Sequence, residues 1–300
     1  MTGSLIERSR SMGMTAQGEI PVSKKKRLEE ILRDMGNVAV AYSSGVDSTY
    51  LLYMAAHVLG ERAAAITAFS PLFSSGEQKE SEEFCRTHGI RHITIPFQPL
   101  ELPAFRENPK DRCYHCKTVL FREIRRLAKE NGYAVVAEGT NLDDLTDYRP
   151  GLAAIEELGI RSPLKEAGLT KADIRALSRE AGLPTWNRPS FACLASRFVY
   201  GEAITEERLI MVGKAEEYLK ELGLRQFRVR IHDTLARIEV EPQEIGRLAA
   251  LPVREELSRR FRELGFRYVT LDLQGYQTGS MNRVLEGDTG GEEAPSFPTG

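Results

Sequence analysis

The chain has 300 residues, of which 41% are apolar, and this is enough material for two hydrophobic cores of ordinary domain size. Its 41 lysines and arginines are balanced by 43 aspartates and glutamates, which gives a formal net charge of −2 at pH 7. This balance argues against a protein whose main task is to bind nucleic acid, because such proteins usually present a basic surface.

The N-terminal segment and the hydropathy of the chain bear on its location. Residues 1–22 are polar and aperiodic, so we expect them to be disordered, and they lack the continuous apolar core of a signal peptide. No apolar stretch approaches the roughly 20 residues that a membrane-spanning helix requires, so no membrane partner is expected. We therefore expect a cytoplasmic protein.

Strand-like and helix-like segments alternate over the first half of the chain. A helix is predicted over residues 24–35, where a Gly-Asn pair follows as its stop signal. Strands are predicted over residues 38–43, 63–71, 91–97 and 133–140, and helices over residues 47–60, 75–89 and 113–132. The alternation indicates an α/β, Rossmann-like domain whose parallel sheet is covered by helices on both faces.

The pattern changes after residue 141. A polar loop is followed by predicted helices at 153–159 and 170–182, and by a long irregular stretch at 183–197. A second set of elements then comprises a helix at 205–223, alternating strands at 227–233 and 236–242, a helix ending at 265 and a strand at 266–273. The chain is thus predicted to have a disordered N-terminus (1–22), an α/β domain (23–197), a smaller α+β domain (198–285) and a disordered tail (286–300).

The stretch AYSSGVDSTYLL joins the first predicted strand to the next helix. Such a junction points unsatisfied backbone N–H groups at one spot, where the helix dipole adds positive potential. Gly45 lets the backbone approach an anion closely, and hydroxyl donors come from Ser43, Ser44 and Ser48. Asp47 would repel a phosphate, so it is better suited to hold Mg²⁺ or to orient the attacking group. A phosphate site and a plain strand-to-helix turn are both compatible with this stretch.

The sequence SSGVDS resembles the PP-loop motif S-G-G-x-D-S of the ATP pyrophosphatase superfamily, with Ser44 in place of the first glycine. Members of this superfamily split ATP into AMP and pyrophosphate and leave an oxygen of the other substrate activated as an adenylate. The resemblance implies an adenine nucleotide alpha hydrolase-like domain that uses ATP and Mg²⁺. It assigns ATP binding to Ser43, Ser44, Gly45, Val46, Asp47 and Ser48, with Asp47 also in the catalytic set.

Two of the four cysteines, Cys113 and Cys116, form a Cys-x-x-Cys pair, and Cys193 follows in the irregular stretch. In a reducing compartment this pattern indicates metal, cluster or redox chemistry rather than disulfide bonds. Three interpretations are open: buried structural thiols, which suits Cys85; a zinc site, for which His115 is badly placed as fourth ligand; and a [4Fe–4S] cluster with one open iron.

Further motifs, taken together, resemble the LarE family of ATP-dependent sulfur transferases in nickel-pincer cofactor biosynthesis. They are SSGVDS, NPKDRCYHCK, GTNLDDLTDYRPG, WNRPSFACLASRFVYG, RVRIHDTLARIEV and RYVTLDLQGYQTGSMN, and the resemblance runs from about residue 23 to residue 283. It implies that ATP adenylates the carboxylates of pyridinium-3,5-biscarboxylic acid mononucleotide and that sulfur then displaces AMP to give thiocarboxylates. It also implies a homo-oligomer, with other nickel-pincer biosynthesis proteins as partners.

Family members differ in their source of sulfur. Some sacrifice one cysteine, which becomes dehydroalanine, and others carry three cysteines and are expected to bind a [4Fe–4S] cluster that relays sulfide. Cys113, Cys116 and Cys193 match the second pattern, so a cluster is predicted, although Cys193 suits either role. The resemblance also places Ser196 and Arg197 in the catalytic set, beside the sulfur site.

The resemblance carries over further binding residues in the second half of the chain. Arg228 and Arg230 would hold the phosphate of the mononucleotide, since a guanidinium fork matches phosphate geometry; the alternative is a solvated strand face. Glu216 and Glu239 would bind a divalent metal between subunits, or else be surface carboxylates.

Three more candidates lie between the two sets of elements. Asp147 and Arg149, within TDYRPG, would orient the substrate or Mg²⁺. Trp186 would stack on a ring of the ligand, or else serve packing, as a single tryptophan more often does.

Two other functions are compatible with parts of the sequence. A tRNA thiolase also combines a PP-loop with three cysteines, but it would need a basic RNA-binding surface, against which the net charge of −2 and the acidic segment 77–83 argue. An iron–sulfur or redox module with a silent PP-loop would not catalyse ATP–pyrophosphate exchange. Nucleic acid is therefore not expected among the partners.

Overall fold

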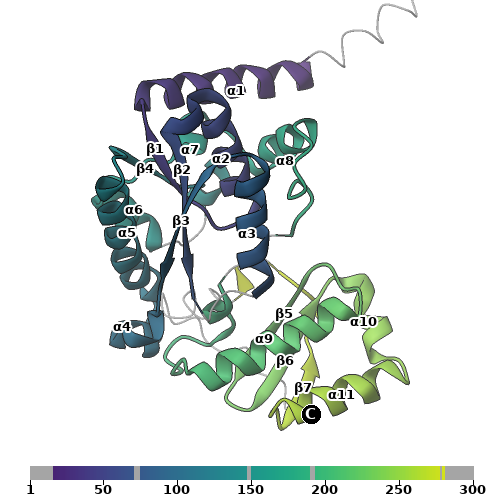
Figure 1. Cartoon of the computed structure of the whole chain (residues 1–300). Helices are drawn as coiled ribbons and strands as arrows, with labels where there is room; N and C mark the ends of the chain where they lie inside the picture. The colour runs from purple at the N-terminus through teal and green to yellow at the C-terminus, as the bar shows by residue number, and fades with distance from the viewer. Residues whose placement is uncertain (1–15, 71–74, 147–149, 190–192, 278, 281–300) are drawn as a thin grey trace, which may run out of the picture. The chain divides into compact units, whose positions relative to one another are not determined.

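The computed structural model describes residues 16–70, 75–146, 150–189, 193–277 and 279–280, which form two compact units (Figure 1). The large unit contains the chain up to Ala195 together with Tyr200–Gly213, and the small unit contains Ser196–Val199 and the chain from Lys214 onward. The expected disordered tail and the expected substrate residues Asp147 and Arg149 lie outside the described residues.

A four-stranded parallel sheet forms the centre of the large unit, in the order β3-β2-β1-β4. Its strands are β1 (Val38–Ala41), β2 (Ala63–Phe69), β3 (Arg91–Pro96) and β4 (Val135–Ala137). The strand order reverses at β1, which has β2 on one side and β4 on the other. Ligands of open parallel sheets bind at the carboxyl ends of the strands at such a switch point. The predicted α/β fold is confirmed, and it singles out the loop after β1.

Helices connect these strands (Figure 1). The longer ones are α1 (Ala16–Met35), α2 (Val46–Leu59), α3 (Ser75–Thr87), α5 (Arg112–Glu130), α6 (Gly151–Glu157) and α8 (Lys171–Glu180). The short ones are α4 (Pro103–Arg106) and α7 (Pro163–Glu166), with 3₁₀ turns η1 (Gly60–Arg62), η2 (Pro99–Glu101), η3 (Leu142–Thr146) and η4 (Leu194–Arg197). The sequence did not predict α4 and α7, because one helical turn carries no periodic pattern.

The two faces of the sheet pack against separate apolar clusters, because successive residues of a strand point to opposite sides. Val38 and Val40 of β1 belong to a cluster with side chains of α1, α2 and α8. Ala39, between them, belongs to a second cluster with side chains of α5 and α6. Helices therefore cover both faces, as predicted.

The first helix starts earlier than the sequence indicated. It begins at Ala16 rather than at residue 24, so residues 16–22 are helical and not disordered. Gly18 and Pro21 obscured this segment, since both residues lower helix propensity. The side chains that dock the helix on the sheet lie further along, at Leu28 and Leu32, and both are fully buried.

The small unit has its own three-stranded sheet, in the order β5-β6-β7. β5 (Phe227–His232) and β6 (Leu235–Val240) pair antiparallel, as predicted, and β7 (Tyr268–Leu271) joins β6 in parallel. The helix α9 (Glu206–Glu221) begins in the large unit and continues into the small one.

The single helix predicted before β7 is two helices, α10 (Pro242–Ala249) and α11 (Val253–Glu263). Pro252 stands between them, and proline cannot donate the backbone hydrogen bond that would continue a helix. The break is therefore local, and both helices still lie between β6 and β7 along the chain.

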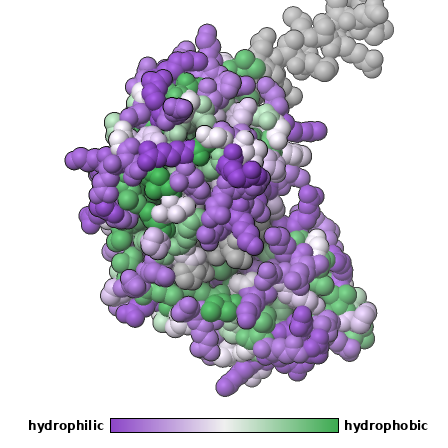
Figure 2. All heavy atoms as spheres, in the orientation of Figure 1, coloured by the Kyte–Doolittle hydropathy of each residue, from purple (hydrophilic) through white to green (hydrophobic). Residues whose placement is uncertain are grey.

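The surface of each unit is largely polar. Figure 2 shows mainly hydrophilic residues on the visible face, while most large apolar side chains of the described residues are buried. Within the described ranges, no helix is long and apolar enough to cross a membrane.

Candidate functional site

Serine hydroxyls form hydrogen bonds within the loop between β1 and α2. The backbone N–H of Ser43 donates to Ser48 Oγ at 3.3 Å, and the hydroxyl oxygens of the two serines lie 3.0 Å apart. Ser48 Oγ also donates to the carbonyl of Gly45 at 3.3 Å. Ser44 lies between them in the left-handed region, with φ +56°, and is buried. The loop is therefore a compact turn with the Ser48 hydroxyl at its centre.

This turn leads directly into the N-terminus of α2. Gly45 is the N-cap residue, and it has no side chain with which to cap the helix. The first N–H groups of a helix have no acceptor within the helix, and the dipole adds positive potential there. The loop residues Ser43 to Ser48 therefore surround a set of backbone donors suited to a phosphate group.

Asp47 is held by residues from two distant parts of the chain. Its carboxylate accepts a hydrogen bond from Lys171 Nζ of α8 and another from Asn141 Nδ2, after β4, at 3.4 Å. Burial raises the pKa of Asp47 and the charge of Asp144 adds to the rise, whereas Lys171 lowers the pKa. Lys171 thus brings a positive charge beside the loop, and no periodic pattern in the sequence pointed to it.

Gly139, in the turn after β4, packs directly behind the first turn of α2. A Cβ atom at this position would lie 2.9 Å from the backbone nitrogen of Ser48 and 3.3 Å from the carbonyl carbon of Asp47. Both neighbours are backbone atoms, so no side chain can move aside to make room. Only glycine allows this close approach.

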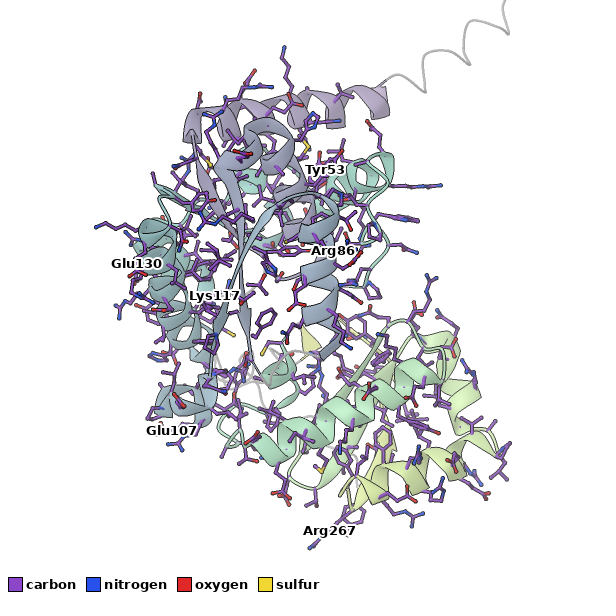
Figure 3. The ribbon with its side chains drawn as sticks, in the orientation of Figure 1. Tyr53, Arg86, Glu107, Lys117, Glu130 and Arg267 are labelled. Atoms are coloured by element: carbon purple, nitrogen blue, oxygen red, sulfur yellow. The ribbon has the colours of Figure 1, made fainter. Side chains whose placement is uncertain are left out.

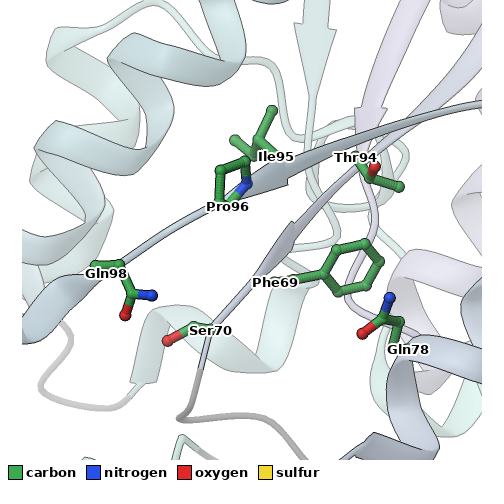
Figure 4. Close-up of a pocket in the computed structure, with 7 residues that line it drawn as sticks. All are labelled: Phe69, Ser70, Gln78, Thr94, Ile95, Pro96 and Gln98. Carbon is green, nitrogen blue, oxygen red and sulfur yellow. The ribbon is translucent and has the colours of Figure 1, made fainter.

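A pocket of about 440 Å³ opens at the carboxyl ends of β2 and β3 (Figure 4). The residues that line it are Phe69, Ser70, Gln78, Thr94, Ile95, Pro96 and Gln98. Because β2 pairs with β1 in parallel, the pocket lies along the same edge of the sheet as the loop. An aromatic ring, aliphatic carbons and amide side chains together suit a flat heterocycle.

Arg112 joins the Cys-x-x-Cys helix to the segment that carries Cys193. It is the first residue of α5, it is buried, and it donates to the carbonyl of Ala195 at 2.9 Å and to the side-chain oxygen of Asn108. Cys113 follows it directly in the chain. The arginine therefore fixes the start of α5 against the chain two residues after Cys193.

The three cysteines lie within electrostatic reach of one another. Burial raises the pKa of Cys116 to about 12, and the charges of Cys193 and Cys113 add to the rise. Arg112 and Lys117, the latter labelled in Figure 3, act in the opposite direction. None of the three thiols forms a disulfide.

The described residues do not form a metal site around these cysteines. Among the described residues, no three His, Cys, Asp or Glu side chains converge on one metal ion. His115, considered as a zinc ligand, instead lies 3.1 Å from the carboxylate of Asp111. The [4Fe–4S] cluster, which would take thiolate ligands, stays a prediction.

The small unit buries two arginine–glutamate pairs. Arg197 donates to both carboxylate oxygens of Glu216, at 2.7 and 2.8 Å, and Arg230 lies 2.9 Å from Glu239. Glu216 also accepts the backbone N–H of Val229 at 3.0 Å. The alternatives of a solvated strand face and of surface carboxylates are wrong, because all four side chains are buried. The divalent-metal role of Glu216 and Glu239 stays a prediction.

Arg228 is buried near two other arginines. Burial and the charges of Arg197 and Arg230 lower the pKa of Arg228 to about 10, and its guanidinium lies over the ring of Tyr276, 5.0 Å from the centroid. The backbone carbonyl of Ser196 accepts from Arg230 at 2.8 Å. The structure thus brings together Ser196 and the three predicted arginines, which suits an anionic group.

Trp186 has a partner within the large unit. The guanidinium of Arg179 lies 5.1 Å from the centroid of its ring. The indole is half-buried, so one role seen here is to pack against α8.

A parallel α/β sheet with a serine- and glycine-lined loop after its first strand and an aspartate in the first turn of the next helix defines a PP-loop protein. No family model matches the chain. It is 39% identical over 264 residues to the pyridinium-3,5-bisthiocarboxylic acid mononucleotide synthase of Lactiplantibacillus plantarum, covering 88% of this chain and 95% of that protein. The chain belongs to this family of synthases, the LarE family, and it is an enzyme.

Two further relatives frame this assignment. An uncharacterised protein of Synechocystis sp. is 44% identical over 263 residues, covering 88% of this chain and 98% of that protein. The tRNA-specific 2-thiouridylase of Xanthobacter autotrophicus is 29% identical over 51% of this chain and 49% of its own length. The similarity to the tRNA enzyme thus covers only half of each chain.

We expect the substitution Gly139→Ala to lower the free energy of unfolding by about 1–3 kcal/mol, because the new Cβ would collide with the backbone of Ser48. Urea unfolding measures this change. Gly246→Ala is the matched control, since a Cβ at that position of α10 meets nothing within 4 Å and alanine favours a helix. Equal stability of the two variants would contradict the close packing of Gly139 on α2.

We expect the thiols of the metal-free protein to react with iodoacetamide in a defined order, because the thiolate is the reactive form. Cys113 and Cys193 are exposed and should react first. Cys116, whose pKa is raised to about 12, should react slowly at pH 7, and its rate should rise about tenfold per pH unit up to pH 10. Peptide mass spectrometry measures each rate, with buried Cys85 as the slow reference. Reaction of half-buried Cys116 as fast as exposed Cys113 at pH 7 would contradict the raised pKa of Cys116.

Proposed function

We propose that the chain is an ATP-dependent sulfur transferase that converts the carboxylates of pyridinium-3,5-biscarboxylic acid mononucleotide into thiocarboxylates. The relative from Lactiplantibacillus plantarum is named for the bisthiocarboxylic acid product. A carboxylate oxygen is a poor leaving group, so its replacement by sulfur needs prior activation. The loop around Ser48, at the N-terminus of α2, is the observation that carries the proposal, because it offers a site for the pyrophosphate part of ATP.

Activation follows from the residues around the loop. The backbone N–H groups at the start of α2 bind the β- and γ-phosphates, and the pocket beside Phe69 receives the adenine ring. A substrate carboxylate oxygen attacks the α-phosphorus, pyrophosphate leaves, and an acyl adenylate results. Asp47 would hold Mg²⁺, which neutralises charge on the departing pyrophosphate. Lys171, which pairs with Asp47, lies beside the same loop and could also neutralise a phosphate oxygen.

The arginines of the small unit supply a site for the mononucleotide phosphate. Arg228 is buried, and its pKa is lowered by that burial and by the charges of Arg197 and Arg230. A phosphate monoester there would stabilise the charged guanidinium and be oriented by its planar fork. The pairs Arg197–Glu216 and Arg230–Glu239 keep the surrounding side chains in place.

The sulfur step replaces the adenylate. Sulfide attacks the carbonyl carbon, the carbon–oxygen bond to AMP breaks, and a thiocarboxylate and AMP result. Cys113, Cys116 and Cys193 would hold a [4Fe–4S] cluster, which supplies an open iron site for sulfide. In the alternative, the thiolate of Cys193 makes the attack itself and is left as dehydroalanine after its carbon–sulfur bond breaks. The expected homo-oligomer and the partner proteins of the pathway stay predictions.

We expect Asp47→Asn to reduce pyrophosphate release by at least about 100-fold when ATP, Mg²⁺ and the biscarboxylic mononucleotide are present, because the metal loses its carboxylate ligand. A coupled assay for pyrophosphate measures the rate. Asp34→Asn, on the exposed side of α1, is the matched control and should keep the full rate. Release that requires tRNA in place of the mononucleotide would identify a tRNA thiolase instead.

We expect protein purified without oxygen to contain about four iron atoms and four acid-labile sulfides per chain, because three cysteines are available as ligands. Cys113→Ser should lose both, and Cys85→Ser, in the buried core, should keep both. Iron and sulfide analysis decides the matter. The sacrificial route would be established if the protein held no iron after anaerobic reconstitution and if Cys193 had lost the mass of one H₂S after turnover.

A further inference from the structure

Ser44 occupies a backbone conformation that side chains other than glycine rarely adopt. Its φ is +56°, and it is 3% exposed. It stands where the PP-loop motif has glycine, for which this conformation carries no steric penalty. A serine there needs support from its surroundings to stay in place.

Arg188 supplies a direct contact to this strained residue. Its Nη1 donates to the carbonyl oxygen of Ser44 at 2.9 Å, and its Nη2 pairs with the carboxylate of Glu80 in α3. The guanidinium is therefore fixed between the loop and a neighbouring helix.

The backbone of Arg188 is fixed as well. Arg175, in α8, donates to the carbonyls of Trp186 and Arg188, at 2.8 and 2.7 Å. These two bonds hold the segment after α8 in one conformation. Because both ends of the Arg188 side chain are held, its contact sets the direction of the Ser44 carbonyl.

The direction of this carbonyl determines the direction of the next N–H group. In a planar trans peptide the C=O of Ser44 and the N–H of Gly45 point to opposite sides. We propose that Arg188 is a positioning residue that holds the Ser44–Gly45 peptide so that the N–H of Gly45 faces the polyphosphate of ATP. Without it, the peptide can rotate to relieve the strain at Ser44, and a carbonyl oxygen would then face the anion. This proposal rests on the proposed use of ATP.

The test is a double-mutant cycle on the full chain, because glycine at position 44 should make Arg188 dispensable. The probe is α,β-methylene-ATP with Mg²⁺, which cannot be cleaved between the α- and β-phosphates, and calorimetry measures its Kd. We expect Arg188→Ala to weaken binding about 10- to 50-fold, as for loss of a charged hydrogen bond. The double variant Ser44→Gly/Arg188→Ala should bind within about threefold of Ser44→Gly alone, because glycine adopts this conformation without a steric penalty.

Two further variants separate this role from general structural support. Arg188→Lys keeps one donor for the Ser44 carbonyl and should bind the analogue more tightly than Arg188→Ala. Arg179→Ala removes an arginine that contacts Trp186 rather than the loop, and it should bind as the wild type does. Thermal melting of every variant shows whether it is folded.

The outcomes are distinct. Unchanged binding by Arg188→Ala overturns the inference, and so does a double variant as weak as Arg188→Ala, since the arginine would then act on the nucleotide or on the fold and not through Ser44. A wild-type chain that does not bind the analogue at all overturns the proposed function, and the inference with it.

Discussion

The position of the first turn of α2 is the constraint on which the rest of the candidate site depends. Its backbone N–H groups can bind a phosphate only if they stay at the edge of the sheet, at the switch point beside β1. Gly139 packs behind this turn, Asn141 and Lys171 hold Asp47 at its side, and Arg188 holds the residue before its N-cap. The turn is therefore fixed from the β4 side, from α8 and from the segment after α8.

Buried charged side chains also pair with one another in the small unit. A buried arginine or carboxylate costs free energy to remove from water, and a partner offsets this cost only with good geometry. Arg197 and Glu216 meet through two hydrogen bonds, so that pair is well compensated. Burial, together with the charges of two neighbouring arginines, lowers the pKa of Arg228 to about 10. A bound anion, as in the proposed phosphate site, would lower this cost at Arg228.

The part of the site that is local in sequence could be predicted, and the part built from distant residues could not. The loop from Ser43 to Ser48 carries its own signal, because hydroxyls and glycine between a strand and a helix suit a phosphate. Lys171 contacts Asp47 across 124 residues, and Arg188 contacts Ser44 across 144. Neither cation stands in a pattern that differs from an ordinary helix terminus or loop. The sheet was predictable for a similar reason, since the alternation of strands and helices is visible along the chain. The start of α1 was not predictable, because Gly18 and Pro21 lower the helix propensity of that segment.

The electrostatics of the three cysteines bear on the choice between the two sulfur sources. A thiol whose pKa is raised to about 12 is a poor nucleophile and a poor ligand at neutral pH until a cation takes up the charge of its thiolate. If Cys193 alone donated sulfur, Cys113 and Cys116 would have no part in the reaction. Bound iron would instead take up the charge of each thiolate. Arg112, through its bond to Ala195, fixes the start of the helix that carries Cys113 and Cys116 against the chain after Cys193. A shared cluster would thus give a role to all three cysteines, whereas a single-cysteine donor would leave two of them without one, and this is the reason to propose the cluster first.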